Sequence, residues 1–161
     1  MRSLITLITT VLLLSGCGFA LRGTAIPLPE RFTQTYFKDS LGINNRFERR
    51  LRQQIELGGG QLVDEEQAKV SITVSPIKER SRQMALSSNG YAKEYERTYS
   101  TTITVVNLKT GVQLGNRTVT SVQNLQLDDR HVLAGEEESD TIRDIAEQEL
   151  VRQMMQYLKT L

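Results

Sequence analysis

The sequence contains one cysteine and one histidine among its 161 residues, Cys17 and His131. A disulfide needs two cysteines, and a metal site needs two or more His or Cys ligands at fixed spacing, so we expect neither. No G-x-S-x-G motif surrounds a serine, and the glycines at 58–60 are followed by no P-loop lysine. These absences argue against an enzyme, a metal centre and a bound cofactor.

Charge of one sign is not in excess. The chain has 20 Lys and Arg against 19 Asp and Glu, whereas nucleic-acid binding needs a marked basic surplus. The charges are clustered, however, with arginines at 46, 49, 50 and 52 and acids concentrated between Asp128 and Asp140. We interpret the arginines as the solvated face of an amphipathic helix, and the acids as favourable charge ahead of a helix N-terminus.

Long hydrophobic runs are also missing. The apolar run at residues 4–14 has eleven residues, whereas a membrane-spanning helix needs about 20. It follows Arg2 and leads into Ser15, Gly16 and Cys17, and small residues directly before a cysteine are typical of a bacterial lipoprotein signal. An ordinary signal peptide with an incidental cysteine is the alternative.

Cleavage before Cys17 would divide the chain into three parts. Residues 1–16 are the cleaved signal peptide, residues 17–29 a lipidated tether whose two prolines favour extended backbone, and residues 30–161 a single periplasmic domain. Each buried CH₂ of an acyl chain contributes ~0.8 kcal/mol, so two or three chains on Cys17 would hold the protein on a membrane. Gly18 replaces the aspartate that usually retains bacterial lipoproteins in the inner membrane, so we expect the outer membrane.

Hydrophobic periodicity predicts an α+β domain of order β-α-β-β-β-α. A first strand spans 31–38, and a helix capped by Asn44 or Asn45 ends at the glycines 58–60. Further strands are expected at 70–75, 94–106 and 112–125, followed by an acidic loop at 128–138 and a last helix capped by Ser139 or Asp140. The apolar stripe of that helix consists of Ile142, Ile145, Ala146, Leu150, Met154 and Leu158. Two helices would then pack on one face of a four-stranded mixed sheet, leaving the other face to solvent or a partner.

The string Cys-Gly-Phe-Ala-Leu-Arg-Gly at 17–23 resembles the start of the LPS-assembly lipoproteins, the LptE family. Later pieces resemble the same family in order: the helix segment Leu51–Ile55 leading to Gly60, the Glu94-Tyr95 step, the Val132-Leu133-Ala134 step before Glu138, and the helix Gln148–Leu158. The resemblance implies a protein that plugs the lumen of the LptD β-barrel, assists its assembly, binds lipopolysaccharide (LPS) and helps to deliver it to the cell surface. Some members carry basic residues where this chain has Ser88 and Gly135.

A binder of LPS phosphates needs exposed cations, and arginine can hold a phosphate through two hydrogen bonds. The polar stretch 77–93 contains an Asn-Gly turn at 89–90, across which two hairpin arms would face each other. The candidate LPS site is therefore Lys78, Arg80, Arg82, Lys93 and Arg97. Two alternatives remain open: exposed ion pairs of these cations with Glu79, Glu94 and Glu96, or a site on the arginines of 46–52. The alternative function is a non-catalytic scaffold of another envelope-assembly machine.

Overall fold

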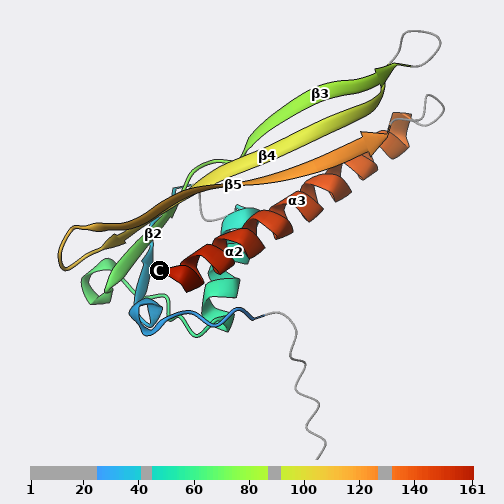
Figure 1. Ribbon diagram of the computed structural model, residues 1–161. Coiled ribbons are helices and arrows are strands. Elements are labelled where there is room, and N and C mark those ends of the chain that lie inside the picture. The colour runs from blue at the N-terminus through green and yellow to red at the C-terminus, as the bar shows by residue number, and fades with distance from the viewer. Residues whose placement is uncertain (1–24, 41–44, 87–91, 127–131) are drawn as a thin grey trace, which may run out of the picture.

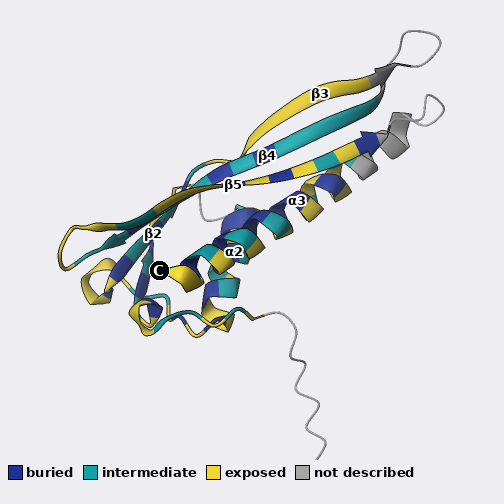
Figure 2. Cartoon of the chain, viewed as in Figure 1, coloured by how far each residue is buried: buried dark blue, intermediate teal, exposed yellow. Residues whose placement is uncertain are grey.

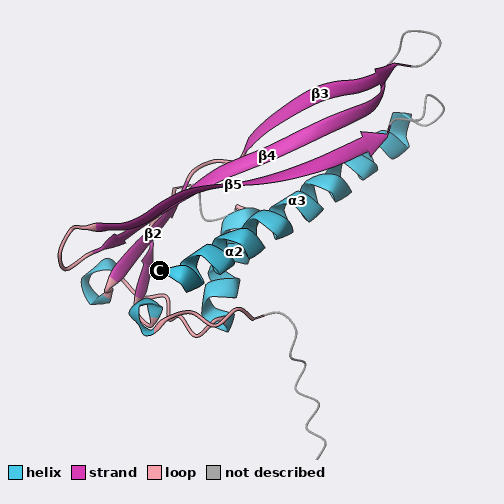
Figure 3. Cartoon of the chain, in the orientation of Figure 1, coloured by secondary structure: helices cyan, strands magenta, loops and turns pink. Residues whose placement is uncertain are grey.

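The computed structural model describes residues 25–40, 45–86, 92–126 and 132–161, so Cys17 lies outside the described residues. The described chain forms an α+β fold, in which two helices lie on one side of a mixed sheet (Figures 1 and 3). Its elements are, in chain order, the 3-10 turn η1 (Glu30–Phe32), β1 (Thr35–Phe37), α2 (Arg46–Leu57), the 3-10 turn η2 (Glu65–Gln67), β2 (Val70–Val74), β3 (Lys78–Leu86), β4 (Ala92–Asn107), β5 (Gln113–Gln126) and α3 (Val132–Thr160).

Strand β4 is the central strand of the sheet and pairs with three others. It pairs antiparallel with β5 along almost its whole length, and its other edge is shared by β2, opposite residues 103–107, and β3, opposite residues 92–100. Strand β1 adds to β2 in parallel. Val74 lies opposite Ile103, and Lys78 lies opposite Ser100. From the end of β2 to the start of β3 the chain therefore advances four residues, whereas the paired part of β4 advances three. The extra residue falls in the bend at 75–77.

The predicted α+β class is confirmed, but the sheet formed by the described residues has five strands instead of four. The additional strand is β3, which lies in the polar stretch where the sequence predicted a hairpin arm facing β4 but no separate strand of the sheet. Residues 78–84 are all exposed, so β3 lacks the hydrophobic alternation of a half-buried strand (Figure 2). Pairing with β4 holds this strand in place, because neither of its faces is buried.

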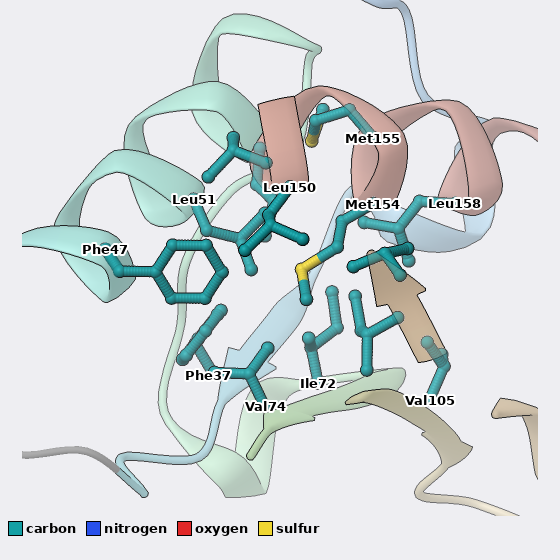
Figure 4. Close-up of a cluster of buried hydrophobic side chains, with 14 of the residues drawn as sticks. Phe37, Phe47, Leu51, Ile72, Val74, Val105, Leu150, Met154, Met155 and Leu158 are labelled. Atoms are coloured by element: carbon teal, nitrogen blue, oxygen red, sulfur yellow. The ribbon is translucent and has the colours of Figure 1, made fainter. Parts of the chain in front are cut away.

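The hydrophobic core lies between the sheet and the two helices (Figure 4). The sheet contributes alternate residues, as in β2, where every second side chain is buried. The helices contribute residues three or four positions apart, which is the spacing that places them on one helix face. The side chains labelled in Figure 4 are Phe37, Phe47, Leu51, Ile72, Val74, Val105, Leu150, Met154, Met155 and Leu158.

Helix α2 begins and ends where the sequence predicts. Asn45 is its N-cap, and the side-chain oxygen of Asn45 accepts hydrogen bonds from the backbone N–H groups of Phe47 and Glu48. At the other end Gly59 has a φ of 95°, a conformation that favours glycine, and the N–H of Gly60 donates to the carbonyl of Ile55. The helix therefore stops at the predicted glycines.

Helix α3 is longer than predicted. It begins at Val132, so residues 136–138 lie in its first turns instead of in a loop, and Ser139 lies within the helix rather than at its cap. Leu, Ala and Glu are strong helix formers, which explains the earlier start. Ile145 is 48% exposed, whereas the rest of the predicted stripe is buried, as are Val151 and Met155. Met155 reaches the end of α2, so α3 buries one face on α2 and another on the sheet.

Candidate functional site

Alternation along β4 gives the sheet two different faces. Tyr99, Ile103 and Val105 are buried on the side of the helices, whereas the even-numbered residues between them are only partly buried. The opposite side, called the outer face below, is covered by neither helix (Figures 1 and 2). Hydroxyl and amide side chains dominate its β4 and β5 positions, and the hydroxyls of Thr102 and Thr118 are hydrogen-bonded across the two strands at 2.9 Å.

Three cations of β3, namely Lys78, Arg80 and Arg82, stand in a line on the outer face and are called the basic row below. Directly opposed side chains of an antiparallel pair share a face. Their partners on β4 are, in the same order, Ser100, Thr98 and Glu96. All three cations are exposed, and neighbours in the row are two residues apart, which is about 7 Å along a strand.

The members of the basic row differ in their pairing. The Nη2 atom of Arg82 lies 3.5 Å from Oε1 of Glu96, with the two side chains 69% and 28% exposed. An ion pair this exposed contributes about 0–1 kcal/mol. Within the described ranges no carboxylate lies at ion-pair distance from Lys78 or Arg80, which face hydroxyls instead. Among the described residues, the basic row therefore offers two cations without an acid partner and one that is weakly held.

Arg97 belongs to a different surface. It lies opposite Ser81 on the helix-facing side of β4. Its Nη1 atom is 3.6 Å from Oε1 of Glu79 and donates a hydrogen bond to the hydroxyl of Ser139 in α3. Arg97 therefore links β3 and β4 to α3, and the side chain of Lys93 lies outside the described residues. Of the five predicted site cations, the structure brings three together.

The arginines of α2 are engaged between the two helices. Arg46 and Arg50 form ion pairs with Asp144 and Glu147 of α3, and the shortest joins Arg50 Nη2 to Asp144 Oδ1 at 2.6 Å. Glu147 is 5% exposed and also pairs with Arg143. The hydrogen bond with Glu147 raises the pKa of Arg46, and the hydrogen bond from Arg50 lowers the pKa of Asp144. These two arginines join the helices instead of forming only a solvated face, which leaves the basic row as the more open cationic surface.

A groove of about 290 Å³ opens beside this ion-pair network, where the bend between β2 and β3 meets both helices. Its lining residues are Ser40, Asn45, Phe47, Pro76, Ile77, Arg143 and Glu147. In the part of the chain that the structure describes, no three His, Cys, Asp or Glu residues gather in a way that could hold a metal ion. Among the same residues, no helix has the length and apolarity needed to cross a bilayer.

A family model for LptE, described as lipopolysaccharide-assembly, matches residues 31–158. The chain belongs to the LptE lipopolysaccharide-assembly family. The resemblance inferred from the sequence motifs is thereby confirmed. A sequence search among curated proteins gives no match.

Solved lipoprotein structures share the fold of this LptE-family chain. Lipoprotein B from Nitrosomonas europaea is 21% identical, with a TM-score of 0.70 over 88% of this chain and 90% of that chain. Rare lipoprotein B from Shewanella oneidensis is 17% identical, with a TM-score of 0.69 over 79% and 94%. A minor lipoprotein from Acinetobacter baumannii is 17% identical, with a TM-score of 0.65 over 83% and 94%. At these identities the likeness shows the fold, and the family assignment depends on the sequence model.

Proposed function

We propose that this LptE-family protein is anchored in the outer membrane by acyl chains on Cys17, faces the periplasm, and works with the β-barrel protein LptD to assemble LPS at the cell surface. In this proposal it plugs the barrel, helps the barrel to assemble and binds LPS itself. Membership of the lipopolysaccharide-assembly family supports the process, and the similar folds of proteins described as lipoproteins support the anchored state.

The observation that best supports an LPS contact is the exposure of the basic row and the lack of neutralising acids beside two of its cations in the described structure. Lys78 and Arg80 are exposed on a face that neither helix covers, and no acid of the described chain neutralises them. LPS carries phosphates, and an arginine fork holds a phosphate through two charge-assisted hydrogen bonds, which are stronger than neutral ones. The basic row therefore has the charge, the exposure and the donor chemistry that this ligand requires.

The basic row lies at a sheet edge, where its charges favour binding of a phosphate over pairing with a further protein strand. In the described residues no strand pairs with the outer edge of β3, and β3 carries charge on both faces, with the basic row on one and Glu79 on the other. Charged edge strands resist pairing with a further strand. A phosphate needs no backbone pairing and is attracted by the same cations. Resistance to strand pairing alone would also explain the charges, so the two explanations must be separated by experiment.

The experiment replaces Lys78, Arg80 and Arg82 together by alanine in the lipidated protein. We expect the variant to remain folded, to purify with LptD, and to bind LPS at least about ten-fold more weakly at low salt, because charged hydrogen bonds are lost. The difference should shrink as salt screens the charges. The matched control replaces Lys69, Lys109 and Lys159, three exposed lysines outside the basic row, and should bind LPS as the wild type does.

Two results would contradict the proposal separately. Unchanged LPS affinity in the folded triple variant at low salt would move the contact away from the basic row. Purification of the lipidated protein with another envelope-assembly complex and without LptD would favour the scaffold function instead.

A further inference from the structure

The two ends of the basic row have different neighbours on β4. Lys78 and Arg80 lie opposite hydroxyl side chains, whereas Arg82 lies opposite the carboxylate of Glu96 and pairs with it. One end of the row is therefore open to an anion, while the other end is already engaged by an acid of the protein itself.

We propose that Glu96 sets the ligand preference of the basic row: a lipid-linked saccharide with two phosphates binds its first phosphate at Lys78 and Arg80 and its second at Arg82, in competition with Glu96. This inference rests on the proposed function, because it takes the basic row to be the LPS contact.

The spacing of the strand supports two separate anionic groups. Lys78 and Arg82 are four residues apart, which is about 13 Å in an extended strand, so one phosphate does not reach both ends. Neighbouring members of the row are about 7 Å apart, and their long side chains can converge on one phosphate. The hydroxyls of Ser100 and Thr98, opposite the open end, can donate further hydrogen bonds to phosphate or sugar oxygens.

Glu96 competes with the second phosphate for Arg82 but does not prevent the phosphate from binding. Its pair with Arg82 is long and exposed, and a two-hydrogen-bond contact between arginine and phosphate is stronger than such a pair, so a phosphate displaces the carboxylate. The displaced carboxylate remains on the same face of β4 and repels the second phosphate. The first phosphate, held by Lys78 and Arg80, lies about 10 Å from Glu96, which is one screening length at about 0.1 M salt, and is affected much less. The wild type therefore discriminates poorly between ligands with one phosphate and ligands with two.

The test measures binding of bisphosphorylated and monophosphorylated lipid A, in neutral detergent micelles, to the full-length protein with Glu96→Gln. We expect affinity for the bisphosphorylated lipid to rise roughly two- to ten-fold at about 0.1 M salt, and affinity for the monophosphorylated lipid to change less than about two-fold. Adding Arg82→Ala should abolish the gain. Glu65→Gln removes the same charge from the exposed turn η2 and should change neither affinity.

Unchanged affinities in folded Glu96→Gln, equal gains for both lipids, or the same gain in Glu65→Gln would each overturn the inference. Thermal melting verifies that the variants are folded, and Glu96→Thr supplies a second neutral side chain with high strand propensity if the glutamine variant unfolds. Failure of the proposed function looks different: the variant with Lys78, Arg80 and Arg82 replaced by alanine would bind both lipids as tightly as the wild type.

Discussion

Arg52 lies over the ring of Phe37, with its Cζ atom 4.4 Å from the ring centroid. The same guanidinium donates to the backbone carbonyl of Phe37 at 3.2 Å and forms an ion pair with Glu48 at 2.7 Å. Arg52 thus fixes α2 to the end of β1 through a cation–π contact and a hydrogen bond, while its ion pair with Glu48 lies within α2. Glu48 is 2% exposed, and its Oε2 atom has no hydrogen-bond partner in the described structure.

We expect Arg52→Ala to lower the free energy of unfolding by about 3 kcal/mol, because it leaves the buried Glu48 without its counter-ion. Adding Glu48→Gln should recover part of the loss, since the amide carries no charge. Gln53→Ala, at the exposed neighbouring position, should stay within about 0.5 kcal/mol. Urea denaturation measures all three. A double variant no more stable than Arg52→Ala would show that the buried charge is not the cause.

Packing of α3 is tested by Leu150→Ala. Leu150 is fully buried between the helices and the sheet, so its truncation should lower the free energy of unfolding by roughly 2–5 kcal/mol. Glu149→Ala, which removes exposed contacts with Arg152 and Gln153, should stay within about 0.5 kcal/mol. Similar melting shifts for the two variants would contradict the observed helix orientation.

The buried hydroxyl of Tyr99 predicts a substitution that does not lower the free energy of unfolding. Tyr99 is 1% exposed, and its hydroxyl has no hydrogen-bond partner among the residues described. Burying an unpaired polar group costs about 1–3 kcal/mol, so Tyr99→Phe should leave stability unchanged or raise it. Tyr95→Phe, at a half-buried position on the same face, is the matched control. A clear loss of stability for Tyr99→Phe in denaturant titration would reveal a partner for the hydroxyl.

The ion pairs between α2 and α3 predict a pH dependence. The hydrogen bond from Arg50 lowers the pKa of Asp144 in the folded protein, below its unfolded value of about 3.9. The unfolded state therefore binds more protons in this range, and the stabilisation is complete above about pH 4 and lost as pH falls through the folded pKa. Asp144→Asn should thus destabilise the protein at neutral pH and by less in acid, as measured by denaturation across pH. Asp64→Asn, at an exposed position, should show no such trend, and a constant Asp144→Asn effect down to low pH would refute the assignment.

The anchor is tested at Cys17. Cys17→Ala removes the thiol that lipidation requires, so we expect loss of label from a palmitate analogue, together with uncleaved precursor or mislocalised protein. Ser15→Ala keeps a small residue before the cysteine and should retain the label. Label that persists in the Cys17→Ala protein would exclude lipidation at this residue.

Elements with one buried face could be predicted from the sequence. Helix α2 combines a capping asparagine, apolar residues every four positions and a glycine stop, and β2 alternates strictly, so both were located within a residue or two. Strand β3 has no buried face and therefore no periodic signal. The sequence predicts the start of α3 too late, because the like charges at 136–138 are also typical of a loop, whereas the helix propensity of glutamate extends the helix through them.

The candidate site was only partly predictable because it depends on strand register. The sequence indicated which cations lie near the turn, and the structure unites Lys78, Arg80 and Arg82. The sequence could not show that Arg97 lies on the other face of the sheet from these three cations, because a register shift of one residue moves a side chain to the opposite face. The pairing of Arg46 and Arg50 with Asp144 and Glu147 joins residues about a hundred positions apart, and only packing of the two helices reveals it.

The bend at 75–77 determines the side of the sheet on which the cations of β3 lie. Even-numbered side chains point toward the helices in β2 and away from them in β3, because the bend contains one residue more than the matching part of β4. Removing that residue would restore a single parity along the edge and turn Lys78, Arg80 and Arg82 toward α3, with Glu79 exposed on the outer face in their place. A deletion that touches no charged residue would thus reverse the electrostatic sign of this outer edge.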